Sequence, residues 1–175
     1  MAVERGWTFG STPFRVFRAL VARHDADVRS VTGSGAAWGD QYDGLVADDM
    51  NGKVVLVVDD DATIRGLLQI TLETEGFGVL TAADGVEGLE RARAERPDLV
   101  ILDIMMPGLD GLQVCHTLKS DPSTGEIPVI LLSAKAQSHD IELGMRVGAN
   151  DYVTKPPDLV GLVNTVRTLL GVAAG

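Results

Sequence analysis

The chain has 175 residues, of which 45% are hydrophobic, and this is enough to build one domain with a substantial core. Its formal net charge of −10 argues against non-specific nucleic-acid binding, which needs clustered lysine and arginine, but suits a protein that holds a cation or meets a basic partner. The single cysteine, Cys115, excludes an intramolecular disulfide, and the absence of a long uncharged apolar run predicts a soluble, cytoplasmic protein without a membrane span.

The first 51 residues differ in character from the rest of the chain. They contain both tryptophans but no long periodic pattern, and the run STPFRVFRALVARH predicts a short helix at residues 13–23. This helix would either dock on a membrane surface or a partner, or belong to a poorly ordered extension, which the flanks rich in Gly, Ser and Asp favour. Because Met50 precedes a natural domain start, residues 1–49 are either a genuine extension or the product of an upstream start, and the sequence leaves both open.

From Lys53 onward, short apolar runs alternate with amphipathic helical patterns. The predicted strands are residues 54–58, 78–81, 99–102, 128–132 and 151–154. The predicted helices are residues 62–75, 85–95, 110–119, 136–147 and 158–170. Strands rich in Val and Ile are typical of a parallel sheet that is buried on both faces. Five such pairs predict a doubly wound α/β domain, a three-layer sandwich, over residues 52–172, with residues 173–175 as a tail.

Polar residues follow most of the predicted strands, at the edge where sites form in open α/β sheets. Four strand ends carry them: Asp59, Asp60 and Asp61 after the first, Asp103 after the third, Ser133 after the fourth, and Tyr152 and Lys155 in and after the fifth. Asp61 also precedes a helical pattern, as does Asp84 after the second strand, and we expect both to cap these helices. If the first strand lies between the second and the third, Asp59, Asp60 and Asp103 converge.

Such a group of carboxylates predicts a cation site. The carboxylates would repel one another and raise one another's pKa values unless a cation joined them, and we expect Mg²⁺ because it is hard and prefers oxygen ligands. Lys155 would add a second positive charge, and Ser133 a hydroxyl donor. This combination suits phosphoryl transfer with a carboxylate as the nucleophile. Each residue alone has an ordinary structural explanation, such as a helix cap for Ser133, and the indication comes from the four strand ends together.

Residues 52–172 resemble the receiver domain of two-component response regulators, the CheY-like fold. Four motifs carry the resemblance: VLVVDDD, LVILDIMMPGLDG, VILLSAKA and GANDYVTKP. The resemblance implies a flavodoxin-like parallel sheet of order 2-1-3-4-5 with five helices. It also implies the following roles: Asp103 as phosphoacceptor; Asp59, Asp60, Asp103 and the backbone carbonyl of Met105 as Mg²⁺ ligands; Ser133 and Lys155 as phosphoryl contacts; Ser133 and Tyr152 as the switch; and a cis bond between Lys155 and Pro156.

The function implied by this resemblance is phosphorelay signalling rather than enzymatic turnover. A histidine kinase or a histidine phosphotransfer protein would present a phosphohistidine, from which Asp103 takes the phosphoryl group as an acyl phosphate. A population shift would then change the surface formed by residues 136–147, 151–154 and 158–170, where an unknown downstream protein binds or a homodimer forms. Because no output segment follows this domain, we expect a stand-alone receiver that acts through protein contacts. From the net charge and the absence of a long apolar run, we expect neither a nucleic-acid partner nor a membrane span.

Three positions leave details of that function open. The family often has Phe after the Lys-Pro pair, where this chain has Pro157, and this change could stiffen the loop before the last helix. Met105 and Lys135 occupy the two positions that tune dephosphorylation in the family. Their combination does not indicate how long the phosphorylated state lasts.

Two alternative functions remain. The segment DDDAT also contains the D-x-D-x-T motif of haloacid-dehalogenase-like phosphatases, in which Asp59 would be the nucleophile and Asp61 the general acid. That reading gives Asp103 no role, and it lacks a further acidic strand end after Lys155. The other alternative is a phosphorylation-independent receiver that serves as a protein-binding module, which the intact set of acidic residues, Ser133 and Lys155 opposes.

Overall fold

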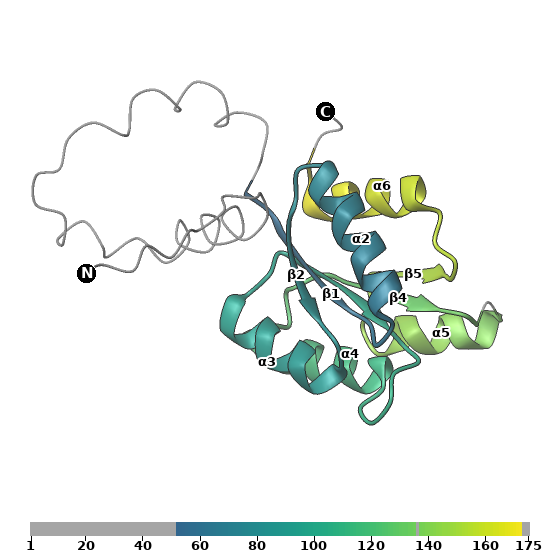
Figure 1. Ribbon diagram of the computed structural model, residues 1–175. Helices are drawn as coiled ribbons and strands as arrows, with labels where there is room; N and C mark the ends of the chain where they lie inside the picture. Colours follow the sequence, from purple (N-terminus) through teal and green to yellow (C-terminus); the bar gives the residue numbers. More distant parts are fainter. Residues whose placement is uncertain (1–51, 136, 173–175) are drawn as a thin grey trace, which may run out of the picture.

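The computed structural model describes residues 52–135 and 137–172, which form a sheet with helices on both of its faces (Figure 1). The extension at residues 1–51, with its predicted helix at 13–23, and the tail at 173–175 lie outside the described residues. The boundaries predicted for the domain therefore remain predictions.

The sheet has five parallel strands in the order β2-β1-β3-β4-β5, which confirms the predicted topology. Their bounds are β1 Val54–Val58, β2 Gly78–Ala82, β3 Leu99–Asp103, β4 Val129–Ser133 and β5 Asp151–Thr154. Every residue of β1, β3 and β4 is buried, because helices cover both faces of the sheet. Val58 pairs with Leu102, so the next residues, Asp59 and Asp103, end neighbouring strands at the same level.

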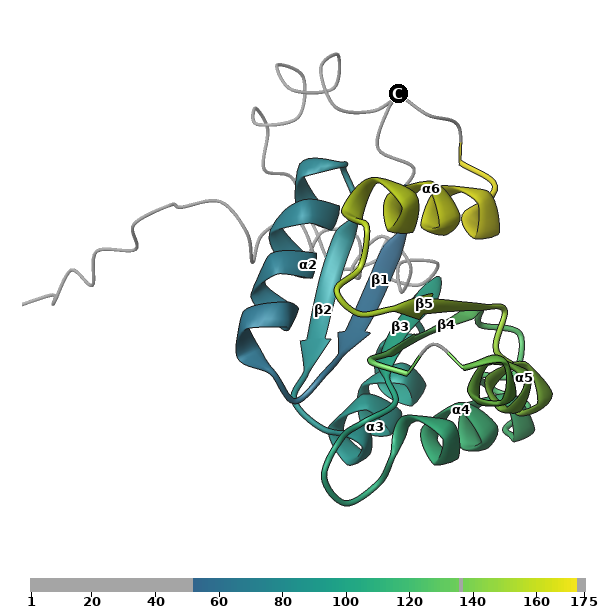
Figure 2. The same cartoon turned by 90° about the vertical axis from the view of Figure 1, so that its right-hand side faces the viewer.

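Five helices cover the sheet: α2 Ala62–Thr74, α3 Gly85–Glu95, α4 Gly111–Ser120, α5 Ser138–Arg146 and α6 Leu159–Leu170. Figures 1 and 2 show α2 and α6 on one face and α3, α4 and α5 on the other. The core is divided in the same way, since Leu68 of α2 and Val166 of α6 belong to one buried cluster, and Ala92 of α3 and Val114 of α4 to the other. The three-layer sandwich expected from the alternating pattern is therefore confirmed.

Aspartate residues cap the N-termini of four of these helices. Two of these aspartates, Asp61 and Asp84, follow shortly after a strand end. Asp61 accepts the main-chain N–H groups of Thr63 and Ile64 at the start of α2, and Asp84 begins α3 in the same way. Both caps were predicted from the sequence, and both are confirmed. The carboxylate of Asp61 therefore caps α2.

Lys119 of α4 forms hydrogen bonds with the chain that enters β4 and β5, at the edge of the sheet opposite the acidic strand ends. Its ammonium donates to the Ile127 carbonyl at 2.7 Å and to Asn150 Oδ1 at 3.0 Å. Asn150 Oδ1 also accepts the N–H of Val129, the first residue of β4, at 2.9 Å. Burial lowers the pKa of Lys119, so these acceptors compensate an ammonium that has left bulk water. One lysine thus joins α4, the chain entering β4 and the chain entering β5.

We expect Lys119→Met to lower the free energy of unfolding by about 2 kcal/mol, because the methionine leaves the part-buried carbonyls of Gly125 and Ile127 without their donor. Urea unfolding followed by circular dichroism measures this change. Because Lys119 lies at the edge opposite the acidic residues, the metal affinity of the folded chain should not change. An unfolding free energy equal to that of the wild type would show that the network contributes nothing.

Candidate functional site

The ends of β1 and β3 bring three carboxylates together. One oxygen from each of Asp59, Asp60 and Asp103 lies within 4.8 Å of the other two. Asp59 and Asp103 are 0% and 2% exposed, whereas Asp60 is exposed to solvent. The structure therefore places these three side chains at one edge of the sheet, as the order of the strands predicts.

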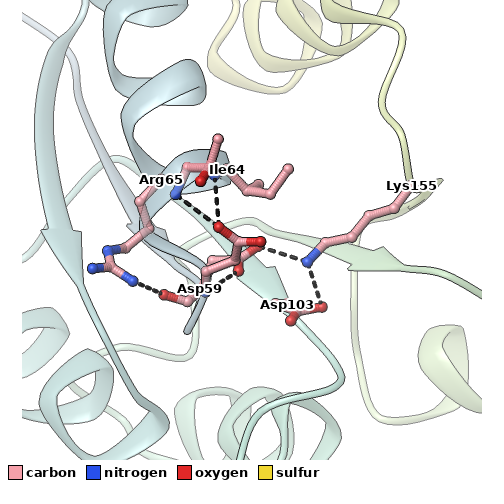
Figure 3. Close-up of polar contacts among 7 residues, drawn as sticks. Asp59, Ile64, Arg65, Asp103 and Lys155 are labelled. Atoms are coloured by element: carbon pink, nitrogen blue, oxygen red, sulfur yellow. Dashed lines mark hydrogen bonds and ion pairs between the residues drawn. The ribbon is translucent and has the colours of Figure 1, made fainter.

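Lys155, in the loop after β5, lies between the two buried carboxylates (Figure 3). Its Nζ atom is 2.7 Å from Asp59 Oδ2 and 3.0 Å from Asp103 Oδ1. Burial lowers the pKa of Lys155, but the bonds and charges of Asp59 and Asp103 raise it by more, so that the net shift is upward. The ammonium is therefore held in its charged form between two acids.

Asp59 is fixed by its neighbours on several sides. Its Oδ1 atom accepts the N–H of Asp61 at 2.9 Å, and its own N–H donates to the Ala82 carbonyl at 3.2 Å. Burial nevertheless raises the pKa of Asp59, and this effect outweighs the opposing hydrogen bonds from Lys155 and from the Asp61 N–H, while the charge of Asp103 raises it further. The single ammonium of Lys155 does not fully compensate the negative charge that this edge would carry.

The acidic cluster fits an oxygen-ligated cation. Asp103 Oδ1 is buried and faces the ammonium at 3.0 Å, but among the described residues it has no hydrogen bond of good geometry. A buried carboxylate oxygen without a directed donor is typical of a metal ligand. Asp59, Asp60 and Asp103 could thus hold a divalent cation, with the exposed Asp60 on the solvent side. Met105 is 57% exposed in the loop after β3, and its carbonyl stays a predicted ligand.

Ser133 and Tyr152 both hold the main chain of Lys135 in the loop after β4. Ser133 is completely buried, and its Oγ atom accepts the Lys135 N–H at 3.1 Å. Tyr152, half-buried in β5, donates its hydroxyl proton to the Lys135 carbonyl at 2.9 Å. The two predicted switch residues therefore meet at one residue of this loop. The Lys155–Pro156 bond is cis, as the resemblance implies.

Two further residues shape the site, and neither was assigned a role from the sequence. Arg65 of α2 donates from Nη1 to the main-chain carbonyl of Asp59 at 2.6 Å. Gly111 begins α4 so close to the Asp103 main chain that a Cβ atom would overlap the Asp103 carbonyl oxygen. Only glycine allows this approach. The signal for Gly111 was present in the run PGLDG, whereas a side chain that bonds to a carbonyl leaves no pattern in the sequence.

Comparisons with known proteins point to one family for this chain. The family model described as "Response regulator receiver domain" matches residues 55–167. The chain is 51% identical, over 116 residues, to the transcriptional regulatory protein CseB of Streptomyces coelicolor, covering 66% of this chain and 48% of that protein. It is 43% identical over 116 residues to the DNA-binding response regulator MtrA of Mycobacterium tuberculosis, covering 66% of this chain and 50% of MtrA.

Solved structures show the same fold. A putative response regulator from Chloroflexus aurantiacus superposes with a TM-score of 0.65 and 34% identity, covering 68% of this chain and 98% of that one. The chemotaxis protein CheY4 of Vibrio cholerae superposes with a TM-score of 0.64 and 31% identity, covering 67% of this chain and 98% of that one. These neighbours leave the haloacid-dehalogenase-like alternative without support.

Some expectations about the whole protein are not supported by these comparisons. The chain spans about half the length of the curated relatives that it matches, so they do not indicate a stand-alone receiver. MtrA is named as DNA-binding, so the relatives give no reason to exclude nucleic acid as a partner. Within residues 52–135 and 137–172, no helix is long and apolar enough to cross a membrane. The fold, the acidic edge and the family match together show that this chain belongs to the response regulator receiver domain family of two-component signalling.

Proposed function

We propose that this domain accepts a phosphoryl group onto Asp103 from the phosphohistidine of a histidine kinase or a histidine phosphotransfer protein. The environment of Asp103 carries the proposal. This buried carboxylate lies within 4.8 Å of two further acids, 3.0 Å from an ammonium, and has an oxygen without a directed hydrogen bond. Such a carboxylate can act as a nucleophile toward phosphorus once a cation compensates the negative charges of its neighbours and of the incoming phosphoryl group.

Each residue of the site has a role in this reaction. An oxygen of Asp103 attacks phosphorus in line, and the new P–O bond forms as the P–N bond to the donor imidazole breaks, with the electron pair staying on nitrogen. Asp59, Asp60 and Asp103 would hold Mg²⁺, with the Met105 carbonyl as a further ligand. When bound, Mg²⁺ neutralises charge on the phosphoryl oxygens. Lys155 would shift from the carboxylates toward the new phosphoryl group and supply the second positive charge.

The structural response follows from the two contacts on Lys135. Ser133 Oγ would leave the Lys135 N–H and donate its proton to a phosphoryl oxygen, which frees the loop after β4. Tyr152 would then release the Lys135 carbonyl and turn inward. The surface of α5, β5 and α6 would change as a consequence, and there we propose that a downstream protein or a second copy of the chain binds. The domain thus acts as a cytoplasmic signalling protein rather than as an enzyme.

The metal requirement gives a direct test. Incubation of the full chain with acetyl phosphate and Mg²⁺ should add the mass of one phosphoryl group, because the cation compensates the acids and the incoming phosphate. Chelation of the metal with EDTA before the donor is added should abolish the added mass. Intact-protein mass spectrometry measures both. If no mass is added in the presence of Mg²⁺, the phosphorylation-independent binding module becomes the better description.

A further inference from the structure

Arg65 contacts the acidic site through main chain rather than through a carboxylate. It projects from the first turns of α2, and its Nη1 atom donates to the Asp59 carbonyl at 2.6 Å. Figure 3 shows its guanidinium on one side of Asp59 and Lys155 on the other. A cationic side chain this close to an acidic cluster, but bonded to a neutral acceptor, requires an explanation other than charge pairing.

The carboxylate of Asp59 does not depend on Arg65. Its two oxygens are already held by the Asp61 N–H at 2.9 Å and the Lys155 ammonium at 2.7 Å. The carbonyl that Arg65 holds belongs instead to the peptide group between Asp59 and Asp60. Because a peptide group is planar, a fixed carbonyl direction also fixes the nitrogen and the Cα atom of Asp60.

Asp60 is the acid that needs this support. It is exposed, and no other described residue forms a hydrogen bond with its carboxylate. Only two rotatable bonds separate its carboxylate from the backbone, so each direction that the carboxylate can take turns together with the Asp60 backbone. In contrast to Asp59, its carboxylate has no hydrogen-bond partner within residues 52–135 and 137–172 that would restore its direction if the peptide turned.

We propose that Arg65 is a positioning residue that holds the Asp59–Asp60 peptide so that the Asp60 carboxylate faces the cation site. This inference rests on the proposed function, because it assumes that the acidic cluster binds a divalent cation. The charge of Arg65 acts in the opposite sense, since a guanidinium near the site repels a cation. Removal of Arg65 therefore weakens cation binding if positioning dominates, and strengthens it if charge alone matters.

The test measures cation affinity in the full chain with Mn²⁺ as the probe, because the electron paramagnetic resonance signal of free Mn²⁺ reports the bound fraction without any phosphorylation. Arg65→Met keeps the long apolar stem but removes the donor and the charge. We expect its dissociation constant to rise about tenfold, the lower end of the loss seen when an outer partner of a metal site is removed. An affinity equal to or tighter than that of the wild type would overturn the proposal.

Arg91→Met is a matched control. Arg91 of α3 donates from Nη1 to the main-chain carbonyl of Thr81 in β2 at 2.5 Å, so the substitution removes the same bond type and the same charge without touching the Asp59–Asp60 peptide. It also removes the ion pairs of Arg91 with Glu87 and Glu95 on α3, which makes it the more severe of the two substitutions. We expect Arg91→Met to keep the Mn²⁺ affinity of the wild type. An equal loss in both variants would show that the effect is a general consequence of losing such a bond.

A double-mutant cycle tests whether the effect passes through Asp60. In an Asp60→Asn background, the added Arg65→Met change should cost little further affinity, because the group that Arg65 positions no longer ligates. If Arg65→Met lowered the Mn²⁺ affinity by the same factor in the Asp60→Asn background as in the wild type, the proposal would be contradicted. Should Arg65→Met fail to fold, Arg65→Lys keeps the charge but loses the planar guanidinium, and it should bind Mn²⁺ more weakly than the wild type; unchanged binding would overturn the proposal.

The same measurements separate this inference from the proposed function. A wild-type chain that binds no Mn²⁺ overturns both. A wild-type chain that binds Mn²⁺, but is not labelled by acetyl phosphate, overturns the proposed function alone. The Mn²⁺ dissociation constants of the wild type and the Arg65 variants then still test the positioning role.

Discussion

Asp103→Asn is expected to abolish labelling by acetyl phosphate or by a phosphohistidine donor while the chain stays folded. The amide has almost the same shape as the carboxylate but is a far poorer nucleophile, so no acyl phosphate forms. Stability should change little, because the substitution removes one of the mutually repelling carboxylates while Lys155 keeps Asp59 as its counter-ion at 2.7 Å. Intact-protein mass spectrometry measures the labelling, and thermal unfolding measures stability.

Asp84→Asn supplies the matched control for this substitution. Asp84 is the exposed cap of α3, and asparagine caps helices about as well as aspartate, so the same chemical change should leave both labelling and stability close to those of the wild type. Labelling that persists in Asp103→Asn would place the nucleophile on another acid. Asp59, the nucleophile of the phosphatase alternative, would be the first candidate.

Lys155→Met is expected to have the second large effect, on both stability and phosphorylation. Without the ammonium, Asp59 and Asp103 lose the cation that lies 2.7 and 3.0 Å away, and we expect a loss of about 3 kcal/mol in the metal-free chain, as for a broken buried ion pair. The initial rate of phosphorylation should fall by about 10²–10³, the effect of removing one preorganised electrostatic group from a reaction centre. Urea unfolding and the time course of labelling measure the two quantities.

Mg²⁺ should restore part of the stability that Lys155→Met loses, because the metal compensates the same carboxylates. Lys119→Met separates this effect from a general loss of stability. It also removes a partly buried ammonium, but at the other edge of the sheet, and it should lose stability while its phosphorylation rate stays unchanged. Phosphorylation of Lys155→Met at the wild-type rate would contradict the role given to Lys155.

The fold could be predicted almost completely because several local signals agreed. Strand β1 was predicted at its observed bounds, 54–58, because a strand buried on both faces appears as an unbroken apolar run. Asp61 and Asp84 marked the starts of α2 and α3, since caps follow a simple rule of residue type and position. The start of α5 was predicted at 136 but lies at Ser138, because Gln137 precedes it without a side-chain cap and leaves no such mark.

The site could be predicted as far as strand order determines it. The convergence of Asp59, Asp60 and Asp103 followed from placing β1 between β2 and β3. The bond from Arg65 to the Asp59 carbonyl could not be predicted, because main-chain acceptors are the same at every position and the sequence does not specify which one a long side chain reaches. The contacts of Ser133 and Tyr152 with the Lys135 main chain escaped prediction for the same reason.

The most direct measurement locates the phosphoryl group itself. Sodium borohydride reduces an aspartyl phosphate to homoserine, so reduction of the labelled chain followed by peptide mass spectrometry reports which acid carried the phosphoryl group. We expect homoserine at position 103 and unchanged aspartate at positions 59 and 60. Homoserine at position 59, or a labelled chain with no reducible aspartate, would contradict this expectation.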